Sequence, residues 1–147
     1  MSKLKRVTLE YKDGVAFCQY RYKHYLFEGE AICHEDDKDF ESELVGLELA
    51  DNRAYLKYLK VRRDELAIRY ETLTGFYKQL KSDKYFNEKS SYALKIEREI
   101  AYVYLELQDC RSAIRNIPRR MDEKIKARED MYQKLRKKRK ALEESEK

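Results

Sequence analysis

Proline, glycine and long apolar runs are scarce in this chain, and each scarcity excludes a class of structure. Pro occurs once and Gly four times in 147 residues, while Asp, Glu, Lys and Arg make up 41%. Few helix breakers among many charges are typical of long, solvated helices. Hydrophobic residues make up 42%, which is too many for a disordered chain.

No apolar stretch approaches the 18 residues that a membrane-spanning helix needs, so we expect no membrane partner. No apolar segment follows the basic start of the chain, so we expect no signal peptide. The three Cys residues, at positions 18, 33 and 110, are odd in number and widely spaced, which indicates reduced thiols. We therefore expect a cytoplasmic protein, in the cytoplasm of the host cell if a phage encodes it.

Motifs for catalysis are missing as well. The sequence has no Gly-rich phosphate loop, no G-x-S-x-G and no H-E-x-x-H, and only two His residues for acid–base chemistry. Cys33 and His34 are consecutive, so on a strand they point to opposite faces and suit neither a nucleophile–base pair nor zinc. Asp36, Asp37 and Asp39 lack the glycine and the terminal Glu of an EF-hand loop. We predict a protein without enzymatic activity, metal or cofactor, in which Cys33 is a buried apolar residue.

The first 33 residues have the pattern of β-strands. Residues 7–11 alternate apolar and polar side chains, and residues 15–22 and 25–33 are rich in β-formers. Asp13-Gly14 is a strong hairpin signal, and Lys23-His24 offers a second turn. Three such strands form a small meander, which is marginal alone and must pack on another element.

The remainder has the pattern of two coiled-coil helices, because apolar side chains recur at alternating spacings of three and four. The first seam consists of Leu49, Asn52, Leu56, Leu59, Arg63, Leu66, Tyr70, Leu73, Tyr77 and Leu80. The second seam consists of Ala93, Ile96, Ile100, Val103, Leu107, Cys110, Ile114 and Ile117. A short polar connection over residues 81–91 makes the two helices antiparallel neighbours.

Two residues interrupt this pattern. Folding the hairpin places Arg63 near Cys110, Glu106 and Asp109, where it either forms a partly buried ion pair or extends out of the seam. Pro118 removes a backbone donor, so we predict a kink or a restart of the helix there. Beyond it the seam positions mix apolar residues with Lys and Arg.

We therefore predict an α+β fold that is mostly α, forming one unit overall. A β-meander and an acidic junction occupy residues 1–38, an antiparallel coiled-coil hairpin occupies residues 39–118, and a basic helix occupies residues 119–147. The meander packs on the base of the hairpin. Three alternatives remain for the basic helix: it packs on the acidic end, it reaches another molecule, or it frays.

Charge is strongly segregated along the chain. Residues 28–51 contain ten carboxylates against one Lys, and the simplest interpretation is a helix start with Asp36 or Asp39 as N-cap. A sharper interpretation is a surface that imitates a phosphate backbone. That candidate partner-binding face consists of Glu35, Asp36, Asp37, Asp39, Glu41 and Glu43.

The C-terminal part is basic instead, with eleven Lys or Arg against four Asp or Glu over residues 119–140. Clustered cations suit phosphate contacts, although a solvated helix end explains them too. The candidate nucleic-acid-binding residues are Lys134, Arg136, Lys137, Lys138, Arg139 and Lys140.

One run of about 30 residues, "GEAICHEDDKDFESELVGLELADNRA", resembles uncharacterised small accessory proteins of bacteriophages and prophages of Gram-positive hosts. The shared pattern is G-x-A-x-C, an acidic turn with Asp-Phe, then G-x-x-x-A-x-x-R-A. It is carried by Gly29, Ala31, Cys33, Asp39, Phe40, Gly46, Ala50, Arg53 and Ala54. The resemblance implies a phage accessory protein and a structural module over residues 29–54, and it transfers no catalytic residue.

We therefore expect a phage-type interaction protein that binds and inhibits a host nucleic-acid-handling complex, such as a CRISPR or other defence nuclease. Direct nucleic-acid binding through the basic helix is the first alternative, and a coiled-coil adaptor or assembly chaperone is the second. The composition leaves a homodimer open.

Overall fold

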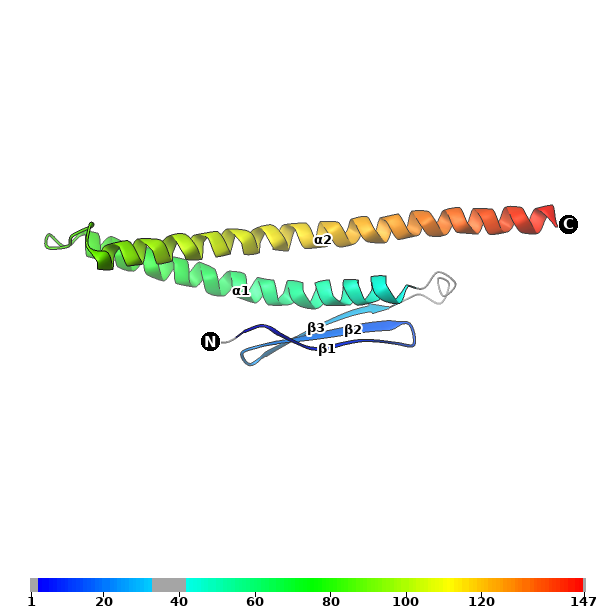
Figure 1. Ribbon diagram of the computed structural model, residues 1–147, viewed down its shortest axis with the longest axis horizontal. Helices are drawn as coiled ribbons and strands as arrows, with labels where there is room; N and C mark the ends of the chain where they lie inside the picture. Colours follow the sequence, from blue (N-terminus) through cyan, green and yellow to red (C-terminus); the bar gives the residue numbers. More distant parts are fainter. Residues whose placement is uncertain (1–2, 33–41, 147) are drawn as a thin grey trace. The chain divides into compact units, whose positions relative to one another are not determined.

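The computed structural model describes residues 3–32 and 42–146 and has the α+β, mostly helical architecture that the sequence predicts (Figure 1). Its elements are β1 (Lys5–Lys12), β2 (Val15–Tyr22), β3 (Tyr25–Ile32), α1 (Glu43–Lys81) and α2 (Ser91–Ser145). The chain divides into two compact units, of which the first comprises Met1–Leu56 with Asn116–Lys147 and the second comprises Lys57–Arg115.

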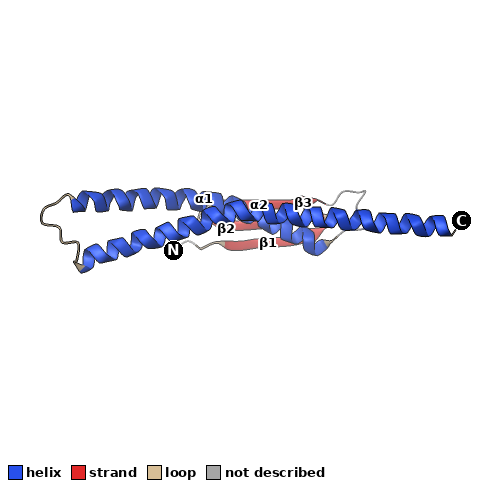
Figure 2. Ribbon diagram, turned by 90° about the horizontal axis from the view of Figure 1, so that it is seen from above, coloured by secondary structure: helices blue, strands red, loops and turns tan. Residues whose placement is uncertain are grey.

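The three strands form an antiparallel sheet in the order β1-β2-β3, as predicted (Figure 2). Lys12 pairs with Val15, which leaves Asp13-Gly14 as a two-residue turn. Both turn residues have positive φ, 52° and 79°, as the hairpin signal requires. The second turn begins with Lys23 at a φ of 55°. The predicted meander is therefore confirmed.

The sheet packs on the start of α1 through unusually small side chains. Ala16, Cys18 and Ala31 on the sheet and Ala50 and Ala54 on the helix form one buried cluster. Small residues let the backbone of the helix approach the sheet closely, so this contact anchors the meander where the sequence predicted it. Leu9, Tyr11, Tyr20, Leu47 and Leu49 extend the apolar contact around the cluster.

The start of α1 differs from the prediction. The Ser42 hydroxyl accepts a hydrogen bond from the backbone N–H of Val45 at 3.3 Å, which makes Ser42 the N-cap. The expected caps, Asp36 and Asp39, lie outside the described residues, and the helix that the structure describes begins later than residue 39. Glu43 supplies the favourable carboxylate of the first turn.

The second unit is the predicted antiparallel hairpin. The α1 residues Leu59, Leu66 and Tyr77 are buried, and none of the predicted seam residues within this unit is exposed. The antiparallel direction follows from contacts between the helices: the Cys110 thiol donates to the Leu59 carbonyl at 3.1 Å near one end. Near the other end the Tyr77 hydroxyl donates to Glu97. The two seams are confirmed.

Of the two alternatives for Arg63, the structure has the one in which its side chain extends out of the seam, and the neighbouring Arg62 forms the ion pair across the hairpin. Arg62 reaches Glu106 at 3.1 Å and also Glu65 at 3.3 Å. The Arg63 Nε instead lies 3.1 Å from the adjacent Asp64 carboxylate. Burying an arginine costs free energy, and the flank of the seam lets Arg62 pair while keeping contact with water.

Pro118 does not restart the helix, because α2 runs unbroken from Ser91 to Ser145 with Pro118 inside it (Figure 2). A proline removes one backbone N–H, and the helical bonds on either side hold the segment here. Within the first unit, Met121 is buried and Lys124 forms an ion pair with Glu48. Of the three predicted fates, the first part of the basic helix therefore packs on the acidic start of α1.

Candidate nucleic-acid interface

The basic run lies near the C-terminal end of α2. All six candidate cations are exposed, and no acidic residue interrupts residues 134–140. At 100° per residue these six side chains spread around the whole circumference of the helix over about 10 Å of its length. A helix that is positive on every side suits contact with phosphates from more than one direction.

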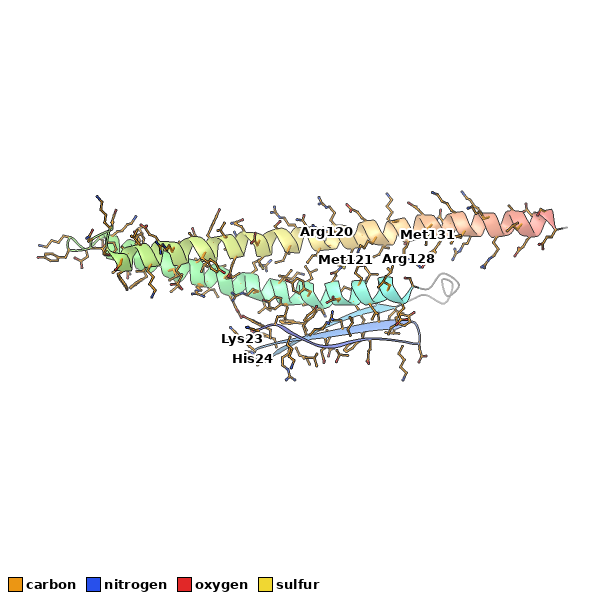
Figure 3. All side chains as sticks on the ribbon, in the orientation of Figure 1. Lys23, His24, Arg120, Met121, Arg128 and Met131 are labelled. Atoms are coloured by element: carbon orange, nitrogen blue, oxygen red, sulfur yellow. The ribbon has the colours of Figure 1, made fainter. Side chains whose placement is uncertain are left out.

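The part of α2 that precedes this run is held on the first unit by side chains on one face. Figure 3 shows Met121 and Arg128 on the side of α2 that faces α1. The Arg128 guanidinium lies 4.7 Å above the Tyr132 ring, and its Nε donates to the Tyr132 hydroxyl at 2.9 Å. The Arg128–Tyr132 contact lies within α2, whereas buried Met121 and the ion pair between Lys124 and Glu48 hold the helix on the first unit, so the basic run follows an anchored stretch of α2.

A cleft of about 430 Å³ lies within the first unit beside this base. Three arginines line it, Arg53 from α1 and Arg128 and Arg136 from α2, against a single carboxylate, Glu129. Its other lining residues are Tyr11, Gly14, Ala31, Ile32, Ser42, Val45, Gly46, Leu49, Ile125, Tyr132 and Gln133. The excess of arginines extends the positive surface from the basic run toward the start of α1.

Two lining residues show how polar groups are used in this cleft. The Arg53 guanidinium donates to the backbone carbonyl of Glu30 at 2.5 Å, which ties α1 to the edge strand β3. The Tyr11 hydroxyl is buried and has no hydrogen-bond partner among the residues that the structure describes. A buried hydroxyl without a partner loses free energy, which a polar group entering the cleft would recover.

Most of the candidate acidic face lies outside the part of the chain that the structure describes. Glu35, Asp36, Asp37, Asp39 and Glu41 lie outside the described residues, as do Cys33 and His34. Glu43 is described, and it is exposed in the first turn of α1. The structure therefore locates all six candidate basic residues and one of the six candidate acidic residues.

Sequence reasoning missed a polar cluster where the sheet meets α1. Asp51 accepts a hydrogen bond from the Tyr20 hydroxyl, lies 3.7 Å from the Cys18 thiol and forms an ion pair with Arg6 at 3.6 Å. Burial, followed by the Asp51 charge, raises the pKa of the Cys18 thiol to about 11. Burial, followed by the hydrogen bond to Asp51, raises the pKa of Tyr20 above its ordinary value.

This cluster has a structural use and lacks the properties of a reactive site. A thiol with a raised pKa stays protonated near neutral pH, and the thiolate is the nucleophilic form. The sequence offered one weak sign of this cluster, which is that the carboxylate of Asp51 directly follows a small residue, Ala50, in the predicted helix. A one-dimensional pattern does not reveal that Tyr20 and Arg6 meet it.

Among residues 3–32 and 42–146, no group of three or more His, Cys, Asp or Glu side chains is arranged to hold a metal ion. None of the helices in the described part of the chain is long and apolar enough to cross a membrane. Comparison of the chain with protein-family models, with curated proteins and with solved structures found no match.

The described residues of the phage-protein resemblance lie in the sheet–helix contact of the first unit, while Cys33, Asp39 and Phe40 lie outside the described residues. Gly29, Ala31, Ala50 and Ala54 form its closest part, and Arg53 bonds to β3 next to Gly29. A Cβ at Gly29 would lie 2.5 Å from the Ala54 backbone N and closer still to the Ala50 carbonyl. The close packing of β3 on α1 therefore explains the glycine at this position without reference to any family.

Proposed function

We propose that this protein is a non-enzymatic, phage-type interaction protein that engages a host nucleic-acid-handling complex through the basic end of α2. The observation that carries the proposal is the uninterrupted basic run of exposed cations over residues 134–140, on a helix that Met121 and Lys124 anchor to the first unit. Such a run can contact the nucleic acid of the complex and compete with other molecules that bind it. Inhibition of the complex follows from that competition.

Three further features support a binding role. The Cys18 thiol is held in its unreactive form by burial and by Asp51. The arginines of the cleft enlarge the positive surface beside the run. The phage-protein resemblance, limited to residues 29–54, is consistent with an accessory protein that acts inside a host cell, and a cytoplasmic location is part of the proposal.

The test is binding of the protein to a labelled nucleic-acid duplex and to a single strand at several salt concentrations. The test variant replaces Lys137, Lys138, Arg139 and Lys140 by Gln, four exposed residues beyond the anchored turns. If each contacts a phosphate, the slope of log affinity against log salt should become shallower by about 3–4. Binding at low salt should fall by more than about tenfold.

The matched control replaces four exposed lysines of the hairpin unit, Lys60, Lys78, Lys84 and Lys89, by Gln. Both variants lose the same four charges, so a difference between them reports position rather than net charge. Equal losses in both variants, or none in either, would refute the basic end of α2 as the contact. Truncation after Pro118 is a poor test, because it also removes the buried Met121 and the Lys124–Glu48 ion pair.

The acidic face is the competing route to the same complex. Reversing Glu35, Asp36 and Asp37 to Lys should leave capture of the host complex intact if the basic end carries the function. Loss of capture in that variant, with capture retained by the four-Gln variant of the basic end, would transfer the function to the acidic face. Repeating the capture after nuclease treatment separates binding to nucleic acid from binding to protein.

A further inference from the structure

The α2 helix carries a second seam, on the side opposite the one that packs on α1. Its positions recur at spacings of four and three, as in the first seam. This outer seam consists of Leu94, Arg98, Ala101, Leu105, Gln108 and Ser112. At 100° per residue its centre lies about 160° around the helix from the buried seam. All six residues belong to the hairpin unit.

Apolar side chains on this face are exposed. Leu94 is 43% exposed and Leu105 is 61% exposed, and Tyr102 and Tyr104 beside them are 66% and 45% exposed. Arg98, Gln108 and Ser112 make half of the seam polar, while Leu94, Ala101 and Leu105 make the other half apolar. Exposed Leu and Tyr side chains that recur at helical spacing indicate a surface for another molecule. The alternating spacing indicates that this molecule is a helix.

We propose that the outer seam binds the outer seam of a second copy of this chain, antiparallel, with a two-fold axis at the level of Val103. The seam is symmetric about that residue, because its positions lie at equal distances on either side. The axis therefore sets Ala101 opposite Leu105 of the second copy, and Leu94 opposite Ser112 of the second copy. In these two layers a large side chain faces a small one, and in the layer between them Arg98 faces Gln108 of the second copy, a polar pair that can hydrogen-bond.

Charges beside the seam identify the second copy as the occupant. In an antiparallel coiled coil each flank of one helix meets the same flank of the other. On one flank Lys95 meets Asp109 of the second copy. On the other flank Glu97, which also accepts a hydrogen bond from the Tyr77 hydroxyl within its own hairpin, meets Arg111 of the second copy. The two-fold axis repeats each of these pairs, so every charged residue on a flank faces a residue of opposite charge on the second copy.

The flanking positions nearest the axis are aromatic. Tyr102 faces Tyr102 of the second copy, and Tyr104, whose ring also lies 5.7 Å from that of Tyr70 in its own hairpin, lies beside Tyr104 of the second copy. A parallel arrangement would instead bring Glu97 near Tyr102 and Tyr104 near Asp109, so the charge pairs would be lost. Complementarity of this face with itself, in one orientation only, is what an isologous interface requires.

Sedimentation velocity of the full chain over a range of concentrations tests the proposal. The wild-type protein should form a dimer, and Lys95→Glu should weaken it by at least about tenfold, because like charges then meet at two places. Adding Asp109→Lys to Lys95→Glu should restore the dimer to within about threefold, since both pairs reform with reversed charges. Both residues are exposed, so circular dichroism should show unchanged helix content.

The matched control is Lys60→Glu, the same charge reversal at an exposed position of α1, which should leave the dimer unchanged. A bismaleimide cross-linker should join two copies of Tyr102→Cys in a Cys33→Ser background, and should not join copies of Glu88→Cys. A wild-type protein that stays monomeric up to about 1 mM would overturn the proposal. A dimer that ignores Lys95→Glu, or that the double variant does not restore, would overturn it too.

Discussion

Gly29→Ala should destabilise the first unit more than the size of one methyl group suggests. The added Cβ would lie 2.5 Å from the Ala54 backbone N, closer still to the Ala50 carbonyl O and 3.1 Å from the Ala54 Cβ. Two of the three obstacles are backbone atoms of α1, which cannot turn aside as a flexible side chain can. The helix and β3 must separate, and the buried cluster of small residues between them must open.

The size of the effect follows from that geometry. Overpacking of a core costs about 1–3 kcal/mol, and a clash with backbone lies at the upper end of that range, near about 3 kcal/mol. For a unit of this size each kcal/mol lowers Tm by about 4–8 °C, so Tm should fall by about 12–24 °C. Thermal unfolding followed by circular dichroism and by tyrosine fluorescence measures it.

Two other glycines provide matched controls. Gly75 has no atom within 4 Å of an added Cβ, so Gly75→Ala should stabilise its helix by about 0.5–1 kcal/mol. At Gly46 the nearest atom, the Ala16 Cβ, would lie 3.4 Å away, which is an ordinary contact, so Gly46→Ala should cost little or stabilise. A loss below about 1 kcal/mol for Gly29→Ala would refute the close approach of β3 and α1.

Two further predictions concern the seam and the thiol. Leu59→Asp places an unpaired charge at a position that is 5% exposed, so it should cost several kcal/mol and unfold the hairpin. Near-unchanged helical circular dichroism of this variant would contradict the assignment of Leu59 to the seam. Alkylation of Cys18, followed by peptide mass spectrometry, should have a pH midpoint near the pKa of about 11. Because the unfolded thiol loses its proton near pH 9 and the folded one later, this group should reduce stability as pH rises from 9 to 11. A midpoint near pH 9 would show that burial and Asp51 do not perturb the thiol.

The sequence alone determined the elements that depend on local pattern. Asp13-Gly14 predicted a tight turn because only a few residue types accept positive φ at both positions, and the structure has it there. The alternating three-and-four spacing predicted both arms of the hairpin, because that spacing places apolar side chains on one helical face. The basic run was likewise visible in the sequence, and the helix exposes all of it.

Only the tertiary structure decided which side chains meet. Whether Arg62 or Arg63 reaches Glu106 depends on the rotation of one helix against the other, which spacing along the chain does not specify. The helix passes through Pro118 because the bonds around it outweigh a single missing donor, although proline alone predicts an interruption. Asp51 contacts Cys18 and Tyr20 of β2 and Arg6 of β1 because the sheet and the helix approach through glycine and alanine, so its role exists only once the sheet and α1 are in contact.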